Sequence, residues 1–104
     1  MTGGMQTPWG VAIMRQQLDD GVFLVQTEAH GGLLIDANKA RTLLSEKARN
    51  IGQRWHDFFA FEQDYDMLVV FYEHPELYPW VEEELTLKFA EDSLRRYHPN
   101  YFTT

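Results

Sequence analysis

The residues that could take part in chemistry gather at two places in the chain. The first is the run His30-Gly31-Gly32, preceded by Glu28. An imidazole and a carboxylate two residues apart lie on the same side of an extended strand, where they could act as a general base and the group that orients it. Two glycines would let a ligand approach the main chain closely. The alternative is a turn or β-bulge in which His30 bonds to the main chain, and we favour this turn.

The second place holds three acids at alternating positions, Glu62, Asp64 and Asp66. Paired carboxylates serve as acid and base in glycosidases, but the same alternation is typical of an acidic helix start. If the chain is an enzyme, we expect a small hydrolase or transferase centred on His30 and Glu28, with Asp64 or Asp66 across a cleft. The sequence has no serine-nucleophile elbow, phosphate-binding loop or dinucleotide fingerprint. We therefore expect no catalytic residue and favour a non-catalytic protein.

Neither a metal nor a cofactor is predicted. The chain has no cysteine, so thiolate metal sites and disulfides are excluded. A metal site could be imagined around His56, His74 and His98 with nearby acids. None of the histidines, however, forms an H-x₃-H or H-E-x-x-H unit, and we expect them to be solvated or to cap other elements.

The charge is negative and unevenly distributed. Nine Lys and Arg against 16 Asp and Glu give a formal net charge of −7 at pH 7. Residues 57–92 hold eleven acids and one base, Lys88, whereas residues 36–54 hold five bases and two acids. Because Lys and Arg supply affinity for phosphates, this balance argues against direct nucleic-acid binding. The uneven charge fits an acidic surface that attracts a basic partner protein. In the simpler reading, the acids only keep the chain soluble.

Aromatic side chains are concentrated in the same acidic part of the chain, around Phe58–Pro79. They exceed what a domain of this size can enclose, and aromatic residues are enriched at interfaces. We therefore expect an apolar patch with an acidic rim that binds a partner. Its predicted residues are Glu62, Asp64, Asp66, Tyr72, Glu73, Glu76, Tyr78, Trp80, Glu82, Glu83 and Glu84. Self-association into a homodimer through the surplus rings is a third reading.

The first half of the chain predicts strands and then a helix. Asp19-Asp20-Gly21 is a tight-turn signal that would join strands within Pro8–Leu18 and Gly21–Thr27 into a β-hairpin. After a break at residues 30–32, Leu33–Ile35 is a short third strand. Apolar residues at helical spacing predict one helix over Ala37–Asn50, capped by Asp36 or Asn38 and ended by the left-handed conformation that Asn50 and Gly52 tolerate.

The second half is less clear. Trp55–Phe61 is a candidate fourth strand, and Gln63–His74 fits a helix or a strand, with the helix favoured. Trp80 begins a last helix that Pro99 ends, with acids in its first turn. The buried stripe of this helix is expected to be Val81, Leu85, Phe89, Leu94 and Tyr97. The fold class is thus α+β: an N-terminal antiparallel hairpin extended to three or four strands and packed against two or three helices.

The chain has 104 residues, which is the size of one domain. We expect residues 1–6 to be a disordered tail or the remnant of an expression tag, and residues 7–102 to form a single α+β domain. No apolar run reaches the ~20 residues of a membrane helix, and the start lacks the pattern of a signal peptide. We therefore expect a cytoplasmic protein without membrane contact.

Several short motifs together resemble a small uncharacterised domain of bacterial genomes, phages and integrating conjugative elements. They are Thr7-Pro8-Trp9-Gly10, the strand Gly21–Thr27, His30-Gly31-Gly32, the block Phe61–Asp66 and Pro75. The family pattern has a TPWG start, a strand ending in T-x-x-HGG, and a Y-E-E-D-C-[DE]-W-A block before F-P. The resemblance covers Thr7 to about Phe102.

The chain departs from that pattern in the acidic block. Glu62-Gln63-Asp64 replaces E-E-D, Tyr65 takes the cysteine position and Met67 the tryptophan position. Any thiol chemistry of the family would therefore be absent. The resemblance implies a mobile element in a bacterial host. With the charge, it favours an acidic, DNA-mimicking inhibitor or modulator of a basic, nucleic-acid-binding host defence protein.

Overall fold

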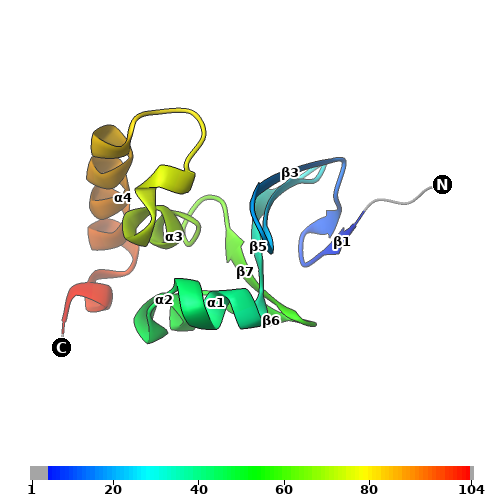
Figure 1. Ribbon diagram of the computed structural model, residues 1–104, viewed down its shortest axis with the longest axis horizontal. Helices are drawn as coiled ribbons and strands as arrows, with labels where there is room; N and C mark the ends of the chain where they lie inside the picture. Colours follow the sequence, from blue (N-terminus) through cyan, green and yellow to red (C-terminus); the bar gives the residue numbers. More distant parts are fainter. Residues whose placement is uncertain (1–4, 104) are drawn as a thin grey trace.

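A five-stranded antiparallel sheet lies at the centre of the fold (Figure 1). The structure is a computed structural model that describes residues 5–103. The strands follow in the spatial order β3 (Met14–Asp19), β4 (Val22–Gln26), β5 (Gly31–Asp36), β7 (Phe58–Glu62) and β6 (Gln53–Trp55). Together with the helices, this sheet confirms the predicted α+β class.

The helices cover one face of the sheet and a small β-ribbon covers the other (Figure 1). The helical side comprises α1 (Ala37–Leu43), α2 (Glu46–Ile51), α3 (Leu68–Glu73), α4 (Glu83–Tyr97) and the 3₁₀ turns η1 (Pro75–Leu77) and η2 (Pro99–Phe102). The ribbon pairs β1 (Gln6–Thr7) with β2 (Gly10–Val11). None of the helices in residues 5–103 has the length and hydropathy needed to cross a membrane.

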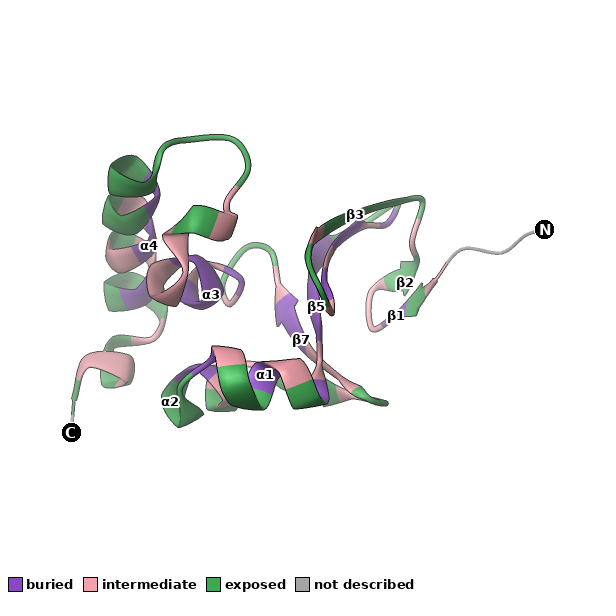
Figure 2. Ribbon diagram, in the orientation of Figure 1, coloured by how far each residue is buried: buried purple, intermediate pink, exposed green. Residues whose placement is uncertain are grey.

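Side chains that alternate along the strands divide the interior between these two faces. The helix-facing core contains Leu33, Ile35 and Phe61 of the sheet, which pack with buried residues of the helices. The opposite face contains Val25, Leu34 and Ala60, which Met5, Trp9 and Ala12 of the ribbon region cover. Figure 2 shows how the buried residues gather on β5, β7 and α3. The central strands are therefore buried on both faces.

The predicted N-terminal hairpin is confirmed as β3 and β4, and its turn residue Gly21 has a φ of 76°. The first strand starts at Met14 and not at Pro8, because residues 10–11 pair with the strand before them. The third strand also differs from expectation. Gly31 and Gly32 do not break the sheet but pair with β4 as the first residues of β5.

The single helix predicted over Ala37–Asn50 is wrong, because the chain forms two helices. Asp36 caps α1 as expected, accepting from the backbone N–H of Asn38 and Lys39. The backbone of Leu44 is extended and ends α1. The Ser45 side chain then caps α2 by accepting from the Ala48 N–H at 3.1 Å. A serine in a helical apolar pattern can thus start a new helix in place of continuing the old one.

The end of α2 also has a different cause from the one expected. Gly52 has a φ of −72°, so no left-handed residue ends the helix there. A Cβ atom at Gly52 would lie 2.7 Å from ring atoms of Phe61. The glycine is therefore explained by the close approach of a buried ring.

The segment around Trp55 forms two strands, β6 and β7, and not one. His56, with a φ of 52°, lies in the turn between them. The helix favoured for Gln63–His74 is confirmed, but it covers only Leu68–Glu73. Residues 1–4 of the expected tail lie outside the described residues, whereas Gln6 lies in β1.

The buried stripe predicted for the last helix is wrong in most of its positions. Thr86, Ala90 and Leu94 are buried, whereas Leu85 and Tyr97 are 52% and 43% exposed. Because α4 packs against α3, the helix buries the face with Thr86, Ala90 and Leu94, and Leu85 and Leu87 face solvent.

Candidate functional site

His30 lies in the tight turn that joins β4 to β5. Its carbonyl accepts from the Thr27 N–H at 2.7 Å and from the Thr27 hydroxyl at 2.6 Å. Its own N–H donates to the same hydroxyl at 3.0 Å. The main chain of His30 is thus held by Thr27, as expected for a structural turn. The imidazole is exposed and available for other contacts.

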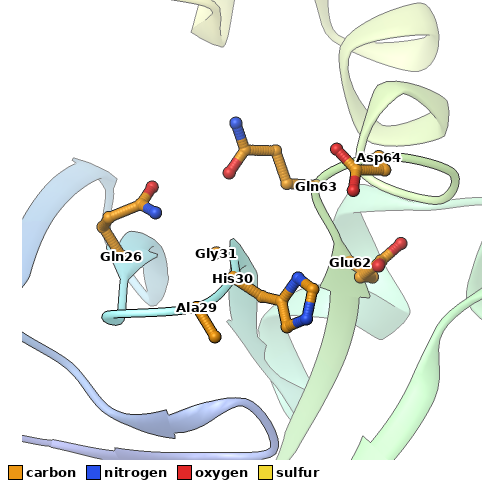
Figure 3. Close-up of a pocket in the computed structure, with 7 residues that line it drawn as sticks. All are labelled: Gln26, Ala29, His30, Gly31, Glu62, Gln63 and Asp64. Atoms are coloured by element: carbon orange, nitrogen blue, oxygen red, sulfur yellow. The ribbon is translucent and has the colours of Figure 1, made fainter.

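Sheet pairing places carboxylates beside this imidazole. Gly32 pairs with Glu62 across β5 and β7, and the Gln63 N–H donates to the Gly31 carbonyl at 2.9 Å. One ligand atom from each of His30, Glu62 and Asp64 lies within 4.8 Å of the others. Figure 3 shows the imidazole turned towards Glu62, with Asp64 on the turn that follows β7. Two segments some thirty residues apart therefore supply one polar cluster.

The cluster borders a cavity of about 220 Å³. Its lining residues are Gln26, Ala29, His30, Gly31, Glu62, Gln63 and Asp64 (Figure 3). A Cβ atom at Gly31 would lie only 2.8 Å from the side-chain oxygens of both Gln26 and Gln63. Glycine at this position thus leaves space for the two glutamine side chains at the edge of the cavity.

The residues proposed for an enzyme are brought together only in part. Asp64 joins His30, but Glu28 lines a different cavity with Trp9 and Thr27. Asp66 lies further along and accepts from His98 Nε2 at 2.8 Å. The proximity of His30 to Glu62 was not predicted from the sequence, because no local pattern reveals that β5 and β7 are neighbours.

Several acids expected to bind a partner are used inside the molecule. Glu73 accepts from the Ser45 N–H at 2.9 Å and from the hydroxyls of Ser45 and Tyr101, each at 2.5 Å. Burial, with the hydrogen bond to Glu73, raises the pKa of Tyr101. Glu76 contacts His74 Nδ1 at 3.1 Å. The Glu73 carboxylate therefore links α3 to the start of α2 and to η2, whereas Glu76 makes only a local contact with a residue two positions before it.

Two of the three expected aromatic residues, Tyr72 and Tyr78, are half-buried, whereas Trp80 lies edge to face against Tyr78 and stays exposed. Tyr72 contacts the rings of Tyr101 and Phe102 edge to face. Tyr78 lies against Phe71 and Phe89. Both are therefore only partly accessible to a partner.

The remaining residues of the expected partner surface form one exposed segment before and at the start of α4. We call Trp80, Val81, Glu82, Glu83, Glu84 and Leu85 the Trp80–Leu85 surface. Trp80 is 57% exposed and Leu85 52%. Within residues 5–103, the side chains of Glu82, Glu83 and Glu84 form no ion pair. Sequence reasoning missed Val81 and Leu85 here because their spacing also fits a buried stripe.

Trp80 also borders an apolar hollow next to the sheet. The hollow has a volume of about 170 Å³ and is lined by Met14, Leu24, Val25, Gln26, Gln63, Met67, Tyr78 and Trp80. Met14, on the edge strand β3, is 56% exposed. The exposed apolar area thus continues from the segment before α4 to the edge of the sheet.

Comparison with known proteins assigns this chain to a family. A family described as "Domain of unknown function (DUF7007)" matches residues 2–104, so the chain belongs to it. This match confirms the expectation of an uncharacterised domain family. No curated protein and no solved structure matches the chain.

Proposed function

We propose that this chain is a non-catalytic binding protein whose Trp80–Leu85 surface engages a basic protein. The observation that carries the proposal is the exposure of Trp80, Val81 and Leu85 next to three consecutive exposed glutamates. Large apolar side chains left in solvent on a folded domain are typical of interaction sites. Trp is among the residues that contribute most to binding energy when a partner covers it.

The charge of the surface determines the kind of partner. Glu82, Glu83 and Glu84 follow Trp80 directly and carry no neutralising partner within residues 5–103. A partner that covers Trp80 would bring its own rim close to these carboxylates. Because like charges across an interface cost free energy and opposite charges speed association, the complementary rim is basic.

The other acids of residues 57–92 support a binding site limited to the Trp80–Leu85 surface. Asp66, Glu73 and Glu76 already bond to His98, Ser45 and His74 within the fold. Replacement of the half-buried Asp66 or Glu73 would disturb the fold as well as the surface charge. The Trp80–Leu85 surface is therefore where binding can be separated from folding.

The more specific form of the proposal concerns the partner's identity. A surface that binds Lys and Arg side chains through carboxylates presents the same charge that a nucleic acid presents. We propose a nucleic-acid-binding defence protein of a bacterial host as the partner, with this chain as its inhibitor in the host cytoplasm. Support comes from the net charge of −7 and from the resemblance to domains of phages and integrating elements.

Affinity capture from a bacterial lysate, followed by calorimetry with the purified captured protein, tests the proposal. We expect a basic partner whose affinity falls as salt rises from 50 to 300 mM. Replacing all three glutamates by Lys (Glu82→Lys, Glu83→Lys, Glu84→Lys) should abolish binding at low salt. Trp80→Ala should weaken it by roughly 30-fold, as expected for a central residue worth ~2 kcal/mol.

A second triple variant serves as the matched control. Asp20→Lys, Glu28→Lys and Asp57→Lys change the net charge equally but alter exposed acids outside the Trp80–Leu85 surface. We expect this control to keep most of the affinity. Equal losses in the two triple variants would mean that only total charge matters. Unchanged affinity in the Glu82–Glu84 variant would show that the partner binds elsewhere; either result would refute the proposal.

A further inference from the structure

We infer that His30, Glu62 and Asp64 form a binding site for a divalent transition-metal cation. This inference does not depend on the proposed function, because none of the three residues belongs to the Trp80–Leu85 surface. One imidazole and two carboxylates supply three ligand atoms within 4.8 Å of one another. At a bond length of ~2.1 Å, ligands of a tetrahedral site lie ~3.4 Å apart, so a small rotation of these side chains suffices. His30 and Asp64 are exposed and Glu62 is half-buried.

The scaffold of the site is held in place without the cation. Thr27 holds both main-chain groups of His30, through hydrogen bonds of 2.6, 2.7 and 3.0 Å. Glu62 is the last residue of β7 and pairs with Gly32. The Gln63 N–H, bonded to the Gly31 carbonyl, ties the segment that carries Asp64 to the same strand. A pre-formed arrangement lowers the ordering cost of binding.

Further oxygens surround the same cavity. Gln26 and Gln63 line it, and their side-chain oxygens both lie 2.8 Å from the position that a Cβ atom of Gly31 would take. The cavity, at about 220 Å³, leaves space for water molecules to complete the coordination. Two carboxylates also give the site the negative charge that a divalent cation compensates.

The ligand types indicate the class of metal. Mg²⁺ and Ca²⁺ prefer oxygen ligands alone, whereas an imidazole nitrogen suits Zn²⁺ and other first-row transition metals. With three side-chain ligands, such a cation keeps positions open for water. It would link the β4–β5 turn to the segment after β7, two places that are far apart in the sequence.

Calorimetric titration of the chelator-treated full chain with ZnCl₂, MnCl₂ and MgCl₂ tests the inference. We expect one equivalent of Zn²⁺ or Mn²⁺ to bind, more tightly than Mg²⁺. His30→Ala and Asp64→Asn should each weaken binding at least ~10-fold, since even loss of an outer-shell partner costs ~10–100-fold. Zn²⁺ should shift the imidazole NMR signals of His30.

His56→Ala is the matched control, because His56 is also exposed but lies in the β6–β7 turn. This variant should bind like the parent protein, and far-UV circular dichroism should show that all variants fold. The inference is overturned if no metal binds at one equivalent. It is equally overturned if His30→Ala and Asp64→Asn bind as tightly as the parent, because the cation would then lie at another histidine.

Discussion

Glu73 offers the sharpest test of the distinction between acids that hold the fold together and acids that face a partner. Its carboxylate accepts three hydrogen bonds, from the N–H and hydroxyl of Ser45 and from the hydroxyl of Tyr101. Ser45 begins α2, and Tyr101 lies in η2 at the other end of the chain. Glu73→Ala removes all three bonds at once and leaves their donors to water.

The size of the effect follows from these contacts. Bonds to charged groups contribute ~1.5–3 kcal/mol when dry, but Ser45 is exposed, so we take ~0.5–1 kcal/mol for each. The three bonds then give a loss of about 2 kcal/mol in the free energy of unfolding. For a domain of this size, that loss lowers the melting temperature by roughly 8–16 °C.

Urea denaturation and thermal melting of Glu73→Ala, Ser45→Ala and the double variant provide the measurement. The single variants should be non-additive, because both of them remove the bond from the Ser45 hydroxyl to Glu73, whereas the bond from the Ser45 N–H is lost only in Glu73→Ala. Asp92→Ala, which removes an exposed acid of α4, should change stability by less than ~0.5 kcal/mol. A loss below ~0.5 kcal/mol for Glu73→Ala, or additive single variants, would refute this account of Glu73.

Two further predictions concern Gly52, which lies against a buried ring, and the raised pKa of Tyr101. Gly52→Ala should destabilise the protein by ~1–3 kcal/mol in urea denaturation, because the added Cβ meets the buried ring of Phe61. A gain of ~0.4–1 kcal/mol would instead show that only backbone freedom matters at this position. Tyr101→Phe should lessen alkaline destabilisation. The raised pKa of Tyr101 makes its stabilising contribution complete below pH ~10 and lost progressively above it. The stability difference between Tyr101→Phe and the parent should therefore shrink from pH 9 to 11, and a constant difference would contradict the assignment.

Local signals in the sequence were sufficient for several elements. The Asp19-Asp20-Gly21 turn predicts the β3–β4 hairpin, because a positive φ at Gly21 is a requirement of the turn itself. Asp36 predicts the start of α1, since capping depends on a side chain and the next few N–H groups. The helix between Gln63 and His74 could also be inferred from the spacing of its apolar residues.

Other features depend on which segments become neighbours. Ser45 starts a second helix, where its N–H and hydroxyl meet the carboxylate of Glu73, 28 residues away. The face that α4 buries, with Thr86, Ala90 and Leu94, depends on its packing against α3 and the rest of the fold. The residues around Ser45 do not reveal its contact with Glu73, and the residues of α4 do not reveal its contact with α3.

The amino-acid sequence by itself determined the fold class, the excess of acids and the absence of thiol chemistry, because composition and short-range patterns suffice for these. Tertiary structure alone decided which acids remain exposed and which imidazole meets a carboxylate. The pairing of β5 with β7 brings His30 beside Glu62, and helix packing leaves Trp80 and Leu85 in solvent. Contacts between distant segments depend on how whole surfaces fit together, and that information is not contained in the spacing of residues along one segment.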